Sequence, residues 1–203
     1  MQMNHIEFPP FSGIRCLMMP YIQGDPASVP DQFRRGYESI LASTFLKWGD
    51  VGYLTIDESP AQKGIPHRGA RARWGRAIHT EAGRHPDMVY AWGGGGWGSG
   101  GGTHRVTLDG DVMILLANNI DNSCAIWNAE HPNTSTDGDI GDCADQCPYA
   151  DAVFMQAGVV HKIGILTPHE SLPIMRDVDR QFLRIVGSGV HGREPYFTEN
   201  PLL

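Results

Sequence analysis

Two short segments place a histidine and a carboxylate two positions apart: His79-Thr80-Glu81 and His85-Pro86-Asp87. Side chains at positions i and i+2 of a β-strand point to the same face, so either pair could offer a nitrogen and an oxygen ligand to one ion. The β-branched Thr80 favours a strand around the first pair, whereas Pro86 cannot donate to a strand ladder. We therefore prefer His79 and Glu81 as half of a metal site.

A third ligand must come from elsewhere in the chain, and two late histidines qualify. His161 lies inside an apolar stretch and could equally be a core or edge histidine. His169 follows Thr167-Pro168, where we expect a strand to give way to a turn and side chains to converge on a pocket. With either histidine, the set would be two imidazoles and one carboxylate, which leaves open positions on iron(II) for a cosubstrate and oxygen.

Two arginines open the next strand candidate, in the run Arg180-Gln181-Phe182-Leu183-Arg184. Alternation puts Arg180 and Arg184 on the same face of that strand. An arginine turned toward the interior must find an anion, and a bound dicarboxylate offers its terminal carboxylate to the guanidinium fork. The alternative is an exposed face that carries two ordinary surface arginines.

This order of features, an H-x-E pair, a late histidine and an arginine that opens the next strand, resembles the iron(II)- and 2-oxoglutarate-dependent oxygenases. Residues 121–128, 167–173 and 180–184 also look like segments of a fungal and microbial branch of that family. The resemblance runs loosely from about residue 52 to residues 195–201. Most members use H-x-D, and a minority use H-x-E as this chain does.

The resemblance implies a fold, a ligand set and a cosubstrate. The family's fold is a double-stranded β-helix, which is a jelly-roll, cupin-like architecture. By position, iron(II) would be bound by His79, Glu81 and His169. The carboxylate of 2-oxoglutarate would be held by Arg180 or Arg184, and two arginines compete for that one role.

The elements that must position these residues are mostly short strands. Apolar residues recur at spacings of three and four between Val29 and Phe45, which predicts one helix that Ser28 can cap and Gly49 can close. Strands are predicted at residues 14–21, 51–56, 104–108, 112–117, 123–128, 152–156, 159–166 and 181–186. Helical crossovers between successive strands are missing from the pattern, so we expect a mainly β sandwich or barrel, flanked by one or two helices.

Composition bounds the class of protein. The 203 residues are 41% hydrophobic and 19% charged, which fits one folded domain, residues 1–203, with the strand and helix of about 12–48 flanking the barrel. No apolar run approaches the roughly 18 residues that span a bilayer, and residues 1–10 lack the pattern of a secretory signal. We therefore expect a cytoplasmic protein with no membrane partner. The sequence is compatible with a homodimer.

The charge of the chain bears on its partners. A net charge of −7 disfavours nucleic acid. A basic group, in which Arg68, Arg71, Arg73 and Arg76 crowd together, could attract an anionic substrate or cosubstrate or could be a solvated loop. The expected partner is a small-molecule or peptidic substrate.

Three further features leave alternatives open. The glycine-rich run 93–102 could be a flexible hairpin end or a mobile flap over a site. The four cysteines read as reduced thiols, with a Cys143/Cys147 bridge or metal clip as the alternative. Trp92, Trp97 and Trp127 could line a substrate site or belong to the core.

Taken together, these features favour a non-haem iron(II)/2-oxoglutarate-dependent dioxygenase that hydroxylates a C–H bond. Two other classes stay open. One is a cupin-like metalloenzyme, an isomerase or hydrolase, that keeps the metal ligands and needs no 2-oxoglutarate. The other is a non-catalytic binding module whose histidines are only hydrogen-bonded in its core.

Overall fold

Strands far outnumber helices among the residues that the structure describes. The computed structural model describes residues 2–42, 49–67, 76–84, 90–92, 104–108, 113–131, 140–187, 190–191 and 197–203. The strands are β1 (Gln2–His5), β2 (Arg15–Ile22), β3 (Val51–Ala61), β4 (Ile78–His79), β5 (Ala82–Arg84), β6 (Tyr90–Trp92), β7 (His104–Leu108), β8 (Met113–Asn118), β9 (Cys124–Trp127), β10 (Ala152–Phe154), β11 (Val159–Gly164), β12 (His169–Ser171), β13 (Val178–Val186) and β14 (Val190–His191). The helices are α1 (Asp31–Arg34) and α2 (Glu38–Ala42), with 3-10 turns η1 (Pro26–Ser28), η2 (Gly141–Gln146) and η3 (Tyr149–Asp151).

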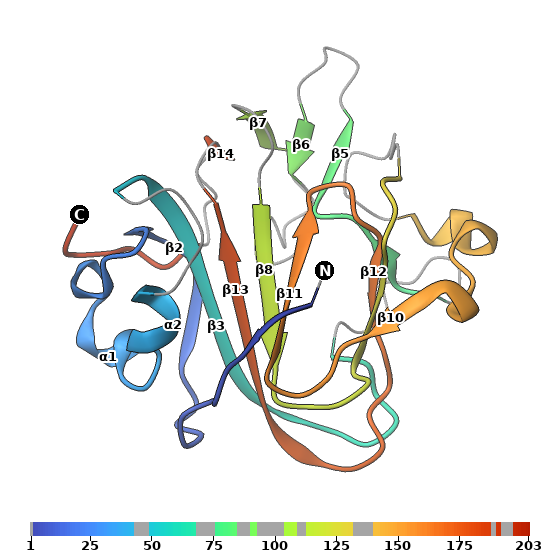
Figure 1. Cartoon of the computed structure of the whole chain (residues 1–203), viewed down its shortest axis with the longest axis horizontal. Coiled ribbons are helices and arrows are strands. Elements are labelled where there is room, and N and C mark those ends of the chain that lie inside the picture. The colour runs from blue at the N-terminus through green and yellow to red at the C-terminus, as the bar shows by residue number, and fades with distance from the viewer. Residues whose placement is uncertain are drawn as a thin grey trace.

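The strands form three antiparallel sheets (Figure 1). The largest has the order β1-β11-β8-β13-β3-β2, the second β10-β9-β12-β4 and the third β14-β7-β6-β5. Across the first two sheets the pairing is nested: β3 pairs with β13, β4 with β12, β8 with β11, and β9 with β10. These eight strands therefore fold over one another like a long hairpin, and the prediction of a mainly β chain is confirmed.

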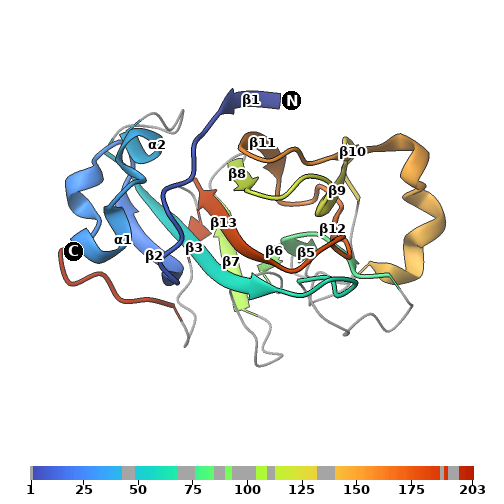
Figure 2. The same ribbon diagram turned by 90° about the horizontal axis from the view of Figure 1, so that it is seen from below.

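Strand alternation separates two faces of the large sheet. Leu183 and Ile185 of β13 belong to the core cluster that packs under α2 and includes Tyr37 and Leu41. On the opposite face, a second cluster joins residues of the large sheet to Ile126 of β9. Because β9 belongs to the second sheet, this face of the large sheet packs against the second sheet. Figure 2 shows α1 and α2 at the opposite end of the molecule from η2 and η3.

The single helix predicted over about 29–48 is wrong as one element. Two short helices, α1 and α2, replace its first part, and residues 43–48 lie outside the described residues. Gly36 separates them with a φ of +84°, and a Cβ there would lie 2.3 Å from Pro9 Cβ, so the turn requires glycine. The apolar stripe was predicted correctly, because Val29, Tyr37 and Leu41 are buried in the core.

Every predicted strand range overlaps an observed strand, but β3 and β13 are several residues longer than predicted. β3 continues through Pro60, although proline is poorly tolerated in a central strand. The pairing explains why it fits: β2 accompanies β3 only as far as the Arg15–Asp57 pair, so Pro60 pairs with β13 alone. The strand expected around the His79–Glu81 pair is found as β4, but it ends at His79. Some strands of two to four residues escaped prediction because they carry little periodicity; these are β1, β5, β6, β12 and β14.

Several predicted features fall outside the described residues. These are Arg68, Arg71, Arg73, Trp97, the His85–Asp87 pair and the glycine-rich run 93–102. All four cysteines are described and are free thiols, so the Cys143/Cys147 bridge is not formed. Among the described helices, none is long and apolar enough to cross a bilayer.

A buried carboxylate ties the N-terminal segment to the large sheet. Glu58 accepts hydrogen bonds from the backbone N–H groups of Ser12, Gly13 and Ile14, the Tyr37 hydroxyl and the Gln181 amide, at 2.7–3.2 Å. Burial opposes ionisation of Glu58, but these hydrogen bonds outweigh it and lower the pKa of Glu58 below its ordinary value of 4.5. The same carboxylate adds to burial in raising the pKa of Tyr37.

We expect Glu58→Gln to remove part of the stability of the fold at neutral pH, by about 1–3 kcal/mol. A carboxylate whose pKa is lower in the folded than in the unfolded chain stabilises the fold above its unfolded value, and that contribution is lost as the pH falls through its folded pKa. Urea unfolding of both proteins at pH 7 and at progressively lower pH below 4.5 measures the effect. The difference in free energy of unfolding between the wild type and Glu58→Gln should become smaller on acidification. A difference that does not change with pH would contradict this account.

Candidate metal centre

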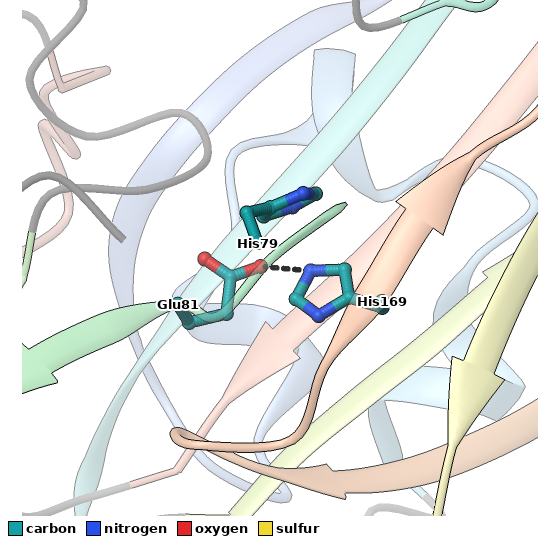
Figure 3. A group of neighbouring side chains, drawn as sticks. All are labelled: His79, Glu81 and His169. Carbon is teal, nitrogen blue, oxygen red and sulfur yellow. Dashed lines mark ion pairs between the residues drawn. The ribbon is translucent and has the colours of Figure 1, made fainter. Parts of the chain in front are cut away.

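The structure brings together the three residues predicted as metal ligands (Figure 3). One ligand atom from each of His79, Glu81 and His169 lies within 4.8 Å of the other two. Strand register explains the approach, because His79 of β4 pairs directly with His169 of β12, and side chains so paired lie on one face of a sheet. The imidazole ring centroids are 3.9 Å apart. His169 opens β12, and the turn predicted at this position precedes it.

Backbone carbonyls fix the orientation of both imidazoles. His79 Nδ1 lies 3.0 Å from the carbonyl oxygen of Ala77, and His169 Nδ1 lies 2.9 Å from that of Thr167. A neutral imidazole that donates from Nδ1 presents the lone pair of Nε2 to an ion. His169 Nε2 indeed points at Glu81, with Nε2 and Oε1 3.3 Å apart. The three residues are 8%, 2% and 5% exposed, in chain order.

Glu170 supports the site from the opposite face of β12. Its Oε1 accepts a hydrogen bond from the backbone N–H of Ala77 at 3.1 Å, so it holds the peptide whose carbonyl orients His79. Its Oε2 accepts from Arg76 and from the Tyr149 hydroxyl, at 2.9 and 3.0 Å. Glu170, which follows the candidate ligand His169, therefore helps to position the candidate ligand His79.

Arg76, the described member of the predicted basic group, lies on this outer face. Burial opposes its charge, but Glu170 and then Tyr149 raise the pKa of Arg76. Its guanidinium also stacks over Tyr149 and donates to the carbonyl oxygen of Cys147. Trp127 packs in the same outer cluster with Ile78, so it belongs to the core and does not line the site.

Arg184 forms a buried ion pair with the carboxylate of the cluster. Its Nη1 donates to both oxygens of Glu81, at 3.0 and 2.9 Å, and each side chain is 3% exposed. Within the described part of the chain, Nε and Nη2 of Arg184 have no hydrogen-bond partner. The interpretation of this residue as a surface arginine is therefore wrong.

Arg180 is also buried, with an exposed fraction of 7%. Its guanidinium lies over the Phe182 ring, 4.7 Å from the centroid. Across the strand pair it faces Ser59, and both Arg180 Nη1 and the Ser59 hydroxyl are buried without a partner among the residues described. Burial lowers the pKa of Arg180 to about 10, against the opposing charges of Asp57 and Cys124. The two oxygens of Asp57 are already bonded to Arg15 and His67.

His161, the alternative third ligand, lies on β11 of the large sheet and is not a member of the cluster. It is buried, and burial lowers the pKa of its imidazole. His85 and Asp87, the alternative ligand pair, lie outside the described residues. Among the candidate ligands that the structure describes, His79, Glu81 and His169 are the ones that meet.

The donor set fits a divalent transition metal. Two imidazole nitrogens and one carboxylate oxygen on one side of an ion suit iron(II) and its neighbours, and three ligands leave positions open for exogenous groups. Arg180 and Arg184 carry buried nitrogens that have no partner in the part of the chain that the structure describes. These nitrogens fit an additional anionic ligand, because a buried donor without a partner is costly.

Sequence reasoning missed the positioning residues of this site. The carbonyl groups of Ala77 and Thr167 belong to the backbone, so no residue type in the sequence points to them. Glu170 could be recognised only from its position next to His169, which places its side chain on the opposite face of the strand. No protein-family model, curated protein or solved structure matches this chain.

Proposed function

We propose that the chain is a non-haem iron(II)- and 2-oxoglutarate-dependent oxygenase that hydroxylates a small or peptidic substrate. The observation that carries the proposal is the buried cluster of His79, Glu81 and His169, with a second buried cation, Arg180, on β13. A metal ligand set with open positions and an anion-binding arginine are the two features that this chemistry requires.

The strand order supports a double-stranded β-helix as the fold. In a jelly roll, a long antiparallel hairpin is wrapped so that its first strand pairs with its last and its second with its seventh. The pairs β3–β13, β4–β12, β8–β11 and β9–β10 follow that order, leaving β5–β7 as an insertion between the second and third strands. Such a wrap explains how residues 79 and 169 become neighbours on one sheet.

The chain's own residues would divide the work around the cofactors. When bound, iron(II) and 2-oxoglutarate supply the redox chemistry that protein side chains lack. His79, Glu81 and His169 would hold the metal, and the carbonyls of Ala77 and Thr167 keep the imidazole nitrogens aimed at it. Burial of all three ligands excludes bulk water from the site.

Arg180 is the better of the two arginines for the distal carboxylate of 2-oxoglutarate. Arg184 already gives Nη1 to Glu81. Arg180 Nη1 has no hydrogen-bond partner among the described residues, and the oxygens of the nearby Asp57 are bonded to Arg15 and His67. The Ser59 hydroxyl opposite could donate to the same carboxylate. A guanidinium and a hydroxyl together match the single charge and two oxygens of that group.

We expect Arg180→Met to raise the KM for 2-oxoglutarate roughly ten- to hundredfold, because a charge-assisted hydrogen bond is lost. Succinate formation coupled to oxygen uptake measures activity, and the exposed Arg176→Met is the matched control. Anaerobic titration of the iron(II) protein should give a cosubstrate-dependent charge-transfer absorption band.

The same measurements separate the other two classes. A metal-loaded protein that forms no succinate and shows no such band would favour a cupin-like isomerase or hydrolase. A protein that takes up no metal, even with added iron(II), would favour a non-catalytic binding module.

A further inference from the structure

Strand β10 forms an open edge of the second sheet. It is the end strand in the order β10-β9-β12-β4, and among the described strands it pairs with β9 alone (Figure 1). The Met155 N–H donates to the carbonyl oxygen of Cys124 on β9, so alternation turns the backbone groups of Ala152 and Phe154 away from β9. An edge of this kind is a template to which another extended chain can add a strand.

Apolar side chains are exposed along this edge. Tyr149 is 44%, Val153 49% and Phe154 36% exposed. The ring centroids of Tyr149 and Phe154 are 6.3 Å apart, and the guanidinium carbon of Arg76 lies 4.1 Å from the centroid of Tyr149. The aromatic surface therefore already packs against one cation. Neighbouring apolar side chains that stay exposed beside an open edge are typical of an interaction surface.

The charge of this region indicates the kind of partner. No lysine or arginine occurs between Arg105 and Lys162, whereas aspartate and glutamate recur throughout that stretch. Arg76 does not offset these charges, because it is paired with Glu170. Two copies of this chain joined at β10 would bring like charges together, whereas a basic segment would be attracted. The exposed acidic residues of η2 and η3 are Asp142, Asp145 and Asp151.

We propose that β10 and η3 bind an extended basic segment of a partner protein. The segment adds a strand to β10, its apolar side chains cover Val153 and Phe154, and its lysine or arginine side chains face Asp151 and the ring of Tyr149. The surface is independent of the proposed metal centre. Strand register places Phe154 in the same row as Glu170, on the opposite face of the sheet from His169.

The test uses the whole chain and a fluorophore-labelled peptide in which lysine and valine alternate, titrated by fluorescence anisotropy at low and at high salt. In one control peptide glutamate replaces lysine. In another, proline replaces valine, which keeps the charge and removes backbone donors. The protein variants are Val153→Lys and Asp151→Lys. Their matched controls are Val51→Lys on β3, where the valine is 44% exposed, and Glu38→Lys on α2.

We expect the lysine–valine peptide to bind the wild type, with a dissociation constant that rises with salt. That constant should increase about tenfold in Val153→Lys and about three- to tenfold in Asp151→Lys, and stay unchanged in the two control variants. The glutamate and proline peptides should bind far more weakly.

Absence of binding to the wild type would overturn the proposal. Equal weakening in Asp151→Lys and Glu38→Lys would also overturn it, because the net charge of the chain would then explain the binding. Equal binding of the proline peptide would refute strand addition. A dimer in sedimentation that Val153→Lys dissociates, without peptide binding, would assign the edge to a second copy of the chain instead.

Discussion

Replacing His169 by alanine is expected to abolish stoichiometric metal binding, while replacing His161 is expected to leave it intact. His169 lies opposite His79 across the β4–β12 pair, and its Nε2 faces Glu81. Removing it leaves one nitrogen and one oxygen from the described cluster, too few to hold an ion against solvent water. The affinity should fall by more than the roughly 10- to 100-fold that is typical of losing a residue behind the ligands.

His161 is the matched control for this experiment. Both histidines are 5% exposed, so both substitutions leave a cavity of similar size, but His161 lies on the other sheet. Metal content after purification without chelator, followed by iron(II) titration, gives the comparison, and thermal unfolding reports the cost of each cavity. Equal loss of metal in the two variants would show that the cluster is not the binding site.

The candidate ligands could be predicted from the sequence because their signal is local. An H-x-E pair beside a β-branched residue predicts two side chains on one face of a strand, and that needs no knowledge of the fold. The strand itself ends at His79, so Glu81 lies two residues beyond it, but the two side chains still meet. The choice between His161 and His169 needed strand pairing, which depends on contacts between residues about ninety positions apart. Pairing of that kind leaves no periodic trace in either segment.

The buried contacts of the arginines could not be predicted for a different reason. Alternation correctly placed Arg180 and Arg184 on one face, but whether that face was exposed depended on the second sheet packing over it. The prediction of one helix between residues 29 and 42 was wrong because of a single residue. Gly36 adopts a positive φ against Pro9, while the apolar stripe continues across the break. Tertiary contact overrode an otherwise regular local pattern.

Glu81→Gln is expected to destabilise the metal-free protein by about 3–5 kcal/mol, the usual consequence of removing one partner from a buried ion pair. The glutamine amide has a similar shape, so packing changes little, but the Arg184 guanidinium would remain buried beside a neutral group. Urea unfolding after chelator treatment and desalting measures this, because bound metal would add its own stabilisation. Arg15→Met serves as the comparison at the surface. The Arg15 side chain is 65% exposed and pairs with Asp57, so its loss is expected to lower the free energy of unfolding by only about 0–1 kcal/mol.

The double variant Glu81→Gln/Arg184→Met separates the charge of the pair from its packing. If Glu81→Gln destabilises the fold because it leaves the buried Arg184 cation without a counter-charge, then removing that cation as well should recover most of the lost stability. Stability would return while metal binding would not, since the carboxylate ligand is gone. A double variant as unstable as the single one would mean that Glu81 stabilises the fold through its shape or through contacts other than the ion pair with Arg184.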